Sequence, residues 1–225
     1  MVGVMDASTP PPRRALLAGA TGLVGHALLP LLLESPRYAE VHVLLRRSVD
    51  LPSHAKVRAH VIDFAQLPAL PAVDDVYVAL GTTIKVAGSQ EAFRRVDLEY
   101  VVSTARAGRA AGATRLAVVS ALGANAGSRV FYNRVKGEMQ AAVAELGFES
   151  VTFAQPALLL GDRAALGQPE RSGEKWGERL FAPLGWLLPK GVRPIRARDV
   201  AAALLAATLE GKPGVNVLSS GAMQP

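Results

Sequence analysis

The sequence predicts an α/β fold, a doubly wound and mostly parallel sheet with helices on both faces and a short C-terminal region beyond it. Two observations support this fold class. From Arg13 onward, short apolar runs alternate with longer segments of helical periodicity. A glycine-rich turn also follows the first apolar run, as is usual where the first strand of such a sheet passes into a helix. A chain of 225 residues is long enough for one such core.

Seven apolar runs are predicted as strands. They are short, and glycine, polar or charged residues border them, as expected for strands that are buried on both faces. In chain order they are residues 15–18, 41–45, 57–62, 76–80, 116–119, 151–154 and 215–218.

Four longer segments are predicted as helices, namely residues 22–34, 90–111, 130–146 and 197–209. Pro36 ends the first helix, because proline lacks the N–H group that a helix interior needs. Gly112 and Gly147 follow the second and third helices as C-caps. Between the last two strands, residues 161–190 show a less regular pattern.

We expect a disordered tail over residues 1–12 and a single domain over residues 13–225. The tail contains a Ser-Thr-Pro-Pro-Pro run and lacks the apolar core of a secretory signal. No apolar run of the chain is long enough to cross a bilayer. These features predict a cytoplasmic protein without a membrane span.

The composition narrows the classes of function. The chain has no Cys, which excludes disulfide frameworks, thiolate nucleophiles and zinc sites made of cysteine. Its 4 His residues form no metal-binding spacing with carboxylates, so we predict no metal site. The net charge is +6, but the basic residues are scattered and no nucleic-acid-binding motif accompanies them. We therefore expect no nucleic-acid partner, and we attribute the charge to attraction of anionic ligands.

The glycine turn has the sequence Gly19-Ala-Thr-Gly22-Leu-Val-Gly25 and lies between the first predicted strand and helix. At a helix N-terminus, free N–H groups and the helix dipole favour an anion such as a pyrophosphate. A Cβ atom on Gly22 would obstruct that anion, and one on Gly25 would push the helix off the sheet. In this context the turn predicts a dinucleotide site of the Rossmann type. The alternative is a glycine turn required only for close packing.

The end of the second strand bears on the choice of dinucleotide. Sites selective for NAD place an acidic residue there, whereas this chain has Arg46, Arg47 and Ser48. Guanidinium groups match a phosphate in charge and in donor geometry, so we predict that Arg46, with Arg47 or Ser48, binds a 2′-phosphate. NADP(H) is thus the preferred cofactor and NAD(H) the second candidate; a solvated basic turn is the alternative. Asp63, beyond the third strand, is placed to accept a hydrogen bond from the adenine amine or to form a plain Asx turn.

Three further residues carry the chemistry of a proton transfer. Tyr132 and Lys136 are four residues apart in the predicted helix 130–146, so they share one face. A tyrosine can give a proton to a carbonyl oxygen as hydride arrives, and a neighbouring ammonium makes that proton easier to lose. Ser120, at the end of the fifth strand, is placed to bind the substrate oxygen. Together they predict the reduction of a carbonyl or the oxidation of an alcohol.

The glycine turn, Ser120 and the run Tyr132-Asn-Arg-Val-Lys136 resemble the short-chain dehydrogenase/reductase superfamily. Other runs narrow the resemblance to the small atypical group of Tat-interacting oxidoreductase-like proteins. These runs are Leu80-Gly-Thr-Thr, Arg95-Val-Asp, Val135-Lys-Gly-Glu and Leu159-Leu-Gly-Asp-Arg. The resemblance covers nearly everything from Arg14 onward.

The resemblance implies a set of cofactor contacts and a catalytic set. The cofactor contacts are Gly19, Thr21, Gly22, Leu23, Val24, Arg46, Asp63, Leu80, Gly81 and Thr82. The catalytic set is Ser120, Tyr132 and Lys136, with Lys136 also binding the nicotinamide ribose. Pro156 and Ala157 would border the carboxamide.

Two departures from the superfamily pattern matter. Asp97 stands where many of these enzymes have Asn, which leaves the proton relay open. Only about seventy residues follow the sixth strand, fewer than sugar-nucleotide epimerases use for their substrate domain, and this argues against an epimerase.

Two functions remain. One is an NADP-dependent oxidoreductase acting on a small carbonyl or alcohol; the other is a cofactor-sensing regulator or assembly protein. The intact catalytic set favours the enzyme, which we expect to be a monomer or a homodimer. The apolar stretch 180–188 is expected to cover the substrate pocket, to form a subunit contact or to lie in the core.

Overall fold

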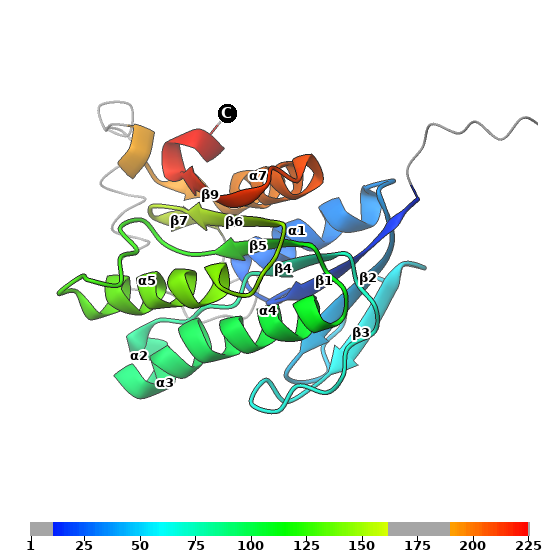
Figure 1. Cartoon of the computed structure of the whole chain (residues 1–225), viewed down its shortest axis with the longest axis horizontal. Coiled ribbons are helices and arrows are strands. Elements are labelled where there is room, and N and C mark those ends of the chain that lie inside the picture. Colours follow the sequence, from blue (N-terminus) through cyan, green and yellow to red (C-terminus); the bar gives the residue numbers. More distant parts are fainter. Residues whose placement is uncertain (1–10, 162–189, 225) are drawn as a thin grey trace, which may run out of the picture.

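The computed structural model describes residues 11–161 and 190–224. It has the predicted doubly wound α/β fold, with a seven-stranded sheet of order β3-β2-β1-β4-β5-β6-β9 (Figure 1). The predictions for residues 1–10 of the tail and for the apolar stretch 180–188 lie outside the described residues.

All seven predicted strands are present, and every pairing in the main sheet is parallel. They are β1 (Arg13–Ala18), β2 (Tyr38–Leu45), β3 (Val57–Val61), β4 (Asp75–Val78), β5 (Arg115–Val119), β6 (Ser150–Gln155) and β9 (Gly214–Ser219). Strand β4 ends two residues before the predicted boundary at Leu80. The strand order reverses between β1 and β4, which is the place where sheets of this type bind ligands beyond their carboxyl ends.

Helices cover both faces of the sheet. Helices α1 (Leu23–Glu34) and α7 (Ala197–Glu210) lie on one face, and α4 (Tyr100–Ala110) and α5 (Phe131–Ala144) lie on the other (Figure 1).

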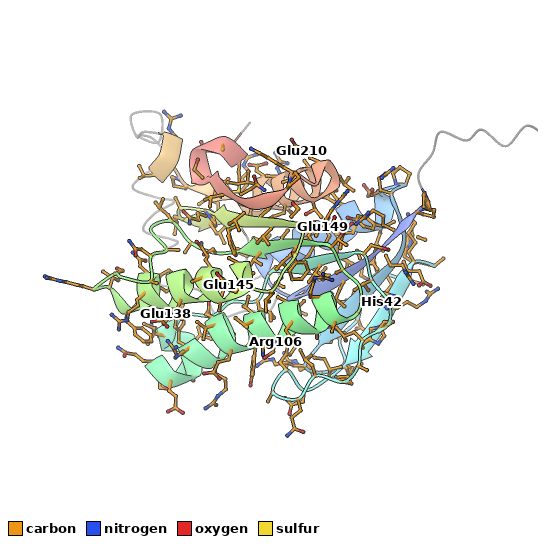
Figure 2. All side chains as sticks on the ribbon, in the orientation of Figure 1. His42, Arg106, Glu138, Glu145, Glu149 and Glu210 are labelled. Atoms are coloured by element: carbon orange, nitrogen blue, oxygen red, sulfur yellow. The ribbon has the colours of Figure 1, made fainter. Side chains whose placement is uncertain are left out.

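The period-two alternation of β1 divides the core between these faces. Ala15 and Leu17 pack in the core with α1 and α7, whereas Leu16 and Ala18 pack in the core with α4 and α5. Charged residues such as Arg106 on α4 and Glu145 at the end of α5 are exposed on the outer faces (Figure 2).

The predicted helix 90–111 is interrupted. It consists of α3 (Gln90–Arg94), a π-helical turn over Arg95–Glu99, and α4. Such turns add one residue to a helix and occur frequently at functional sites. The turn carries Asp97, whose side chain is 1% exposed.

Two small features escaped prediction because they are too short to show a periodicity. One is α2 (Ile84–Ala87), whose N-cap Thr83 accepts a hydrogen bond from the backbone N–H of Val86 at 3.1 Å. The other is a parallel pair formed by β7 (Leu159–Leu160) and β8 (Ile195–Arg196), which borders the less regular region.

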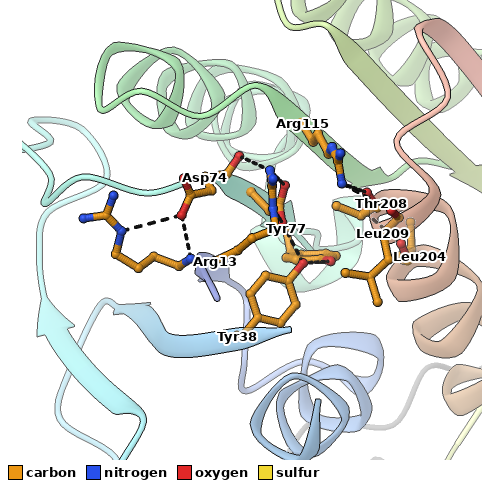
Figure 3. Close-up of polar contacts among 10 residues, drawn as sticks. Arg13, Tyr38, Asp74, Tyr77, Arg115, Leu204, Thr208 and Leu209 are labelled. Carbon is orange, nitrogen blue, oxygen red and sulfur yellow. Dashed lines mark hydrogen bonds and ion pairs between the residues drawn. The ribbon is translucent and has the colours of Figure 1, made fainter. Parts of the chain in front are cut away.

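A buried polar network closes the amino-terminal edge of the sheet (Figure 3). Asp75 accepts hydrogen bonds from Arg13 Nε at 2.7 Å, from Arg13 Nη2 at 2.6 Å and from the Tyr38 hydroxyl at 2.8 Å. The Tyr38 and Tyr77 hydroxyl oxygens are 2.7 Å apart. Burial raises the pKa of both tyrosines, so both keep their protons in the folded protein. On the neighbouring strand, Arg115 donates to carbonyl oxygens at the end of α7.

Candidate functional site

Apart from Tyr132 and Lys136 on α5, the residues predicted for the site lie at or near the carboxyl ends of six neighbouring strands. Because these strands are parallel, all of their carboxyl ends meet at one edge of the sheet. The residues that follow β1, β2, β3, β4, β5 and β6 are, in this order, Gly19, Arg46, Asp63, Leu80, Ser120 and Pro156. The sheet thus brings together residues that are far apart in the sequence.

The three glycines of the first turn differ in the atoms that a Cβ atom would meet at each position. Gly19 has a φ of +94°, and a Cβ atom there would lie 2.5 Å from the carbonyl carbon of Ala79. A Cβ atom on Gly25 would overlap the carbonyl oxygen of Gly19. Gly22, by contrast, has a φ of −83°, and a Cβ atom there would meet its nearest neighbour, the oxygen of Gly19, at 3.4 Å.

The surrounding backbone therefore tolerates a Cβ atom at residue 22, at ordinary contact distance. Close packing explains Gly19 and Gly25 but leaves the glycine at 22 unexplained. Gly22 is the N-cap of α1, and its helix start carries no side-chain cap. A helix N-terminus without a side-chain cap has N–H groups available to an anion such as the pyrophosphate of a dinucleotide.

Arg46, Arg47 and Ser48 are all exposed directly after β2. Asp63 is exposed as well, and its Oδ1 accepts a hydrogen bond from the backbone N–H of Ala65 at 2.8 Å. This contact is that of an Asx turn, so an adenine contact would use the other carboxylate oxygen.

A buried ion pair joins two helices to the loop after β4. Lys136 Nζ lies 2.7 Å from Asp97 Oδ1, and the two side chains are 4% and 1% exposed. Asp97 Oδ2 also accepts a hydrogen bond from the backbone N–H of Thr82 at 2.8 Å. A Cβ atom on Gly81 would lie 3.3 Å from Asp97 Oδ1 and 3.9 Å from Lys136 Nζ, so the loop passes directly over the pair. Asp97 holds Lys136 and the loop together where the superfamily pattern has Asn.

Ser120 and Tyr132 are fixed by different neighbours. Ser120 is 4% exposed, its N–H donates to the carbonyl oxygen of Ala154 at 2.8 Å, and its Oγ accepts from Gln140 Nε2 at 2.6 Å. The Tyr132 ring lies 5.4 Å, between centroids, from the ring of buried Phe93 on α3. Within residues 11–161 and 190–224, no hydrogen bond joins Ser120 to Tyr132.

The remaining predicted cofactor contacts lie at the start of α1 and in the loop after β6. Thr21 precedes the N-cap of α1, and Leu23 and Val24 form its first turn. The backbone N–H of Leu122 donates to the carbonyl oxygen of Pro156 at 3.0 Å, which ties the loops after β5 and β6 to each other. Ala157 follows Pro156 in the second loop.

Sequence reasoning missed three residues of this region. Asp97 was noted only as a departure, and Gln140 had no motif. Gly137 stands next to Lys136, where a Cβ atom would overlap the backbone of Asn125 and Ala126, so only glycine lets that loop pack on α5. A glycine inside an otherwise helical pattern was the one signal available for it. Across the described ranges, no three His, Asp or Glu side chains gather as a metal site, and no helix has the length and apolarity to span a membrane.

The sequence is similar to known proteins. A profile of the NAD(P)H-binding family matches residues 19–151. The protein HTATIP2 of Rattus norvegicus is 33% identical over 178 residues, which cover 76% of this chain and 72% of that protein. The protein FMP52 of Saccharomyces cerevisiae is 33% identical over 175 residues, which cover 76% of this chain and 74% of that protein.

The FMP52 relatives overturn one prediction. Those of Saccharomyces cerevisiae, Candida albicans and Aspergillus fumigatus are named as mitochondrial proteins. The predicted cytoplasmic location is wrong by this finding. The prediction failed because the lack of a secretory signal or an apolar span does not distinguish the cytosol from the interior of an organelle.

Solved structures share the fold. An oxidoreductase of the short-chain dehydrogenase/reductase family from Burkholderia thailandensis superimposes with a TM-score of 0.69 at 20% identity, covering 95% of this chain and 94% of that one. MoeE5 in complex with UDP-glucose and NAD gives a TM-score of 0.68 at 19% identity, covering 91% and 75%. By the family profile and these relatives, the chain belongs to the NAD(P)H-binding family.

Proposed function

We propose that the protein is an oxidoreductase that transfers hydride between NADP(H) and a small carbonyl or alcohol substrate. The observation that carries this proposal is the arrangement at the carboxyl edge. Tyr132 and Lys136 share one face of α5, Lys136 is held by Asp97 beside the loop after β4, and Ser120 lies under the same helix. These are the groups that a carbonyl reduction needs, next to a glycine turn of the kind that binds a dinucleotide.

The residues around the glycine turn fit the cofactor. The N–H groups at the start of α1 would bind the pyrophosphate, and Arg46 with Arg47 would bind the 2′-phosphate. Asp63 would accept from the adenine amine, and Pro156 and Ala157 would border the carboxamide. When bound, the reduced nicotinamide supplies the hydride.

The side chains of the site would handle the proton and the substrate oxygen. As hydride reaches the carbonyl carbon, Tyr132 gives its hydroxyl proton to the carbonyl oxygen, which becomes an alcohol. Lys136 stabilises the resulting tyrosinate and would bind the ribose hydroxyls. Ser120 donates a hydrogen bond to the substrate oxygen, and solvent returns a proton to Tyr132. Oxidation of an alcohol runs through the same groups in reverse.

The test is loss of absorbance at the reduced nicotinamide band with a panel of aldehydes, ketones and quinones. Tyr132→Phe keeps the ring packing against Phe93 and removes only the acidic proton. It should lower kcat by at least about a hundredfold and leave NADPH affinity nearly unchanged. Lys136→Ala should damage both, because its ammonium serves Tyr132 and the ribose.

Two outcomes would overturn the assignment. Turnover that survives in Tyr132→Phe would exclude Tyr132 as the proton donor. Tight NADPH binding with no turnover of any carbonyl, and with Tyr132→Phe indistinguishable from the wild type, would identify a cofactor sensor instead.

A further inference from the structure

Gln140 is a polar residue of the site that the proposed mechanism leaves without a role. It lies on α5 one turn beyond Lys136 and two turns beyond Tyr132, so the three residues share one face of the helix. Its side-chain nitrogen, Nε2, lies 2.6 Å from Ser120 Oγ. The residue that would bind the substrate oxygen is therefore in direct contact with a neutral amide.

A second amide fixes the orientation of the first. Gln155 is the last residue of β6, and its Nε2 donates to Gln140 Oε1 at 3.4 Å. The parallel pairing of β5 and β6 aligns Val119 with Ala154, so Ser120 and Gln155 leave neighbouring strands at the same level. In this arrangement the NH₂ group of Gln140 faces Ser120 and its oxygen faces Gln155.

This geometry determines how Ser120 can use its hydroxyl group. A serine hydroxyl has one hydrogen to donate and two lone pairs that accept. The NH₂ group of Gln140 can only donate, so it occupies a lone pair of Ser120 and cannot receive its hydrogen. The hydrogen of Ser120 is left for a different acceptor, and a substrate carbonyl oxygen is an acceptor only.

We propose that Gln140 is a positioning residue that keeps Ser120 as a hydrogen-bond donor to the substrate carbonyl, with Gln155 holding the amide in place. The proposal rests on the proposed function, since it concerns the substrate of that same reaction. A carboxylate at residue 140 would reverse the polarity: it would accept the hydrogen of Ser120 and remove it from the substrate.

The first experiment tests the contact in the protein without cofactor or substrate. In ¹⁵N-labelled protein, the side-chain amide signals of Gln140 are identified as those that disappear in Gln140→Leu. Ser120→Ala should move these signals, whereas Ser53→Ala, at an exposed serine in the loop after β2, should not. Signals of Gln140 that stay in place in Ser120→Ala would overturn the proposal.

The second experiment tests the polarity with a carbonyl that the wild-type protein reduces. Gln140→Glu should lower kcat about tenfold or more near pH 8 and leave NADPH affinity and the unfolding midpoint unchanged. Its kcat relative to the wild type should rise as pH falls toward about 4.5, where the carboxyl group gains a proton and can donate to Ser120. Gln140→Leu should lower kcat at every pH. The control, Gln90→Glu, adds the same charge at the exposed start of α3 and should follow the wild-type pH profile.

The two proposals fail in different ways. If no carbonyl is reduced by the wild type, the proposed function fails and the role of Gln140 fails with it. If the wild type reduces a carbonyl but Gln140→Glu keeps full kcat with the wild-type pH profile, only the role of Gln140 is wrong. A merely structural Gln140 would lower the unfolding midpoint in both variants and leave the ratio of kcat values independent of pH.

Discussion

The two edges of the sheet use polar residues in opposite ways. At the amino-terminal edge, both oxygens of Asp75 accept hydrogen bonds from Arg13 and Tyr38, and Tyr38 also contacts Tyr77. At the carboxyl-terminal edge, α1 begins at Gly22 without a side-chain cap, and Arg46 is exposed to solvent. The first edge is saturated by its own side chains, whereas the second keeps groups that can bind something else.

The difference shows that burial and charge alone do not identify a functional site. The Arg13–Asp75 pair and the Lys136–Asp97 pair are both short and largely buried, with N–O distances of 2.6 Å and 2.7 Å. What separates them is position: Lys136 lies beside the loop that ligands approach in sheets of this type, and Arg13 lies at the far edge. A change at the amino-terminal edge should therefore alter stability, and a change at the carboxyl-terminal edge should alter binding.

The largest effect is expected at the carboxyl-terminal edge. Gly22→Val should abolish binding of NADPH and of NADH, because the branched side chain occupies the space in front of the N–H groups of α1. The fold should be retained, since a Cβ atom at residue 22 would lie 3.4 Å from its nearest neighbour. Calorimetric titration with both dinucleotides measures the loss. Gly127→Val, at an exposed glycine in the loop before α5, is the control; undiminished binding by Gly22→Val would exclude the phosphate site.

The next largest effect is expected at the amino-terminal edge. Asp75→Asn should lower the free energy of unfolding by about 3–5 kcal/mol, because it leaves the largely buried guanidinium of Arg13 without its counter-charge. Asp74→Asn, one residue earlier, removes a more exposed partner of Arg14 and should cost less than about 1 kcal/mol. Urea unfolding measures both, and NADPH affinity of the folded variants should match the wild type. Equal losses of unfolding free energy in the two variants would contradict the expected difference between the buried and the more exposed ion pair.

Arg46→Ala should have a smaller and more selective effect. It should cost about 1.5–3 kcal/mol of NADPH affinity and little NADH affinity, because only NADPH carries the 2′-phosphate. Titration of each dinucleotide gives the two values. Equal losses of affinity for both cofactors would mean that Arg46 stabilises the turn and does not bind the 2′-phosphate.

The smallest effect concerns pH and the amino-terminal edge. The pKa of Tyr38 is raised by burial, so the unfolded chain loses this proton near the ordinary value of 10.0 while the folded protein keeps it. Stability is therefore unaffected below that pH and falls as pH rises above it, by up to about 1.4 kcal/mol per pH unit for one tyrosine. Tyr38→Phe should flatten this decline in urea midpoints measured between about pH 9 and 11. If the urea midpoint of Tyr38→Phe falls as steeply with pH as that of the wild type, the loss of stability comes from groups other than Tyr38.

The fold could be predicted because its signals are local. Apolar runs and the glycines at strand ends define the seven strands. Helix α1 ends at Glu34, before Pro36 as predicted, although it also contains Pro30, so a proline alone does not define a helix end. The alternation with helices then predicts a parallel sheet, whereas the strand order comes from the structure. The π-helical turn could not be predicted, because the sequence of Arg95–Glu99 shows no break in helical periodicity.

The site was only partly predictable, because its contacts join residues that are far apart in the sequence. Motif positions such as Ser120, Tyr132 and Lys136 are recognisable in the sequence, but the partners that hold them are not. Asp97 reaches Lys136 from another helix, and Gln140 reaches Ser120 across the gap between α5 and the sheet. Such contacts depend on how helices pack, and side-chain type alone does not reveal them.

The π-helical turn has a consequence for insertions and deletions in this chain. An α-helix turns by about 100° per residue, so the extra residue in Arg95–Glu99 shifts the rotational phase of α3 relative to α4. Both helices nevertheless bury a residue fully, Phe93 in α3 and Val101 in α4. Loss of one residue from the turn would rotate Phe93 and the aromatic contact to Tyr132 away from the site, while Val101 keeps its place in the core. A length change of a single residue here would therefore displace the surroundings of Tyr132 without a point substitution and without repacking the sheet.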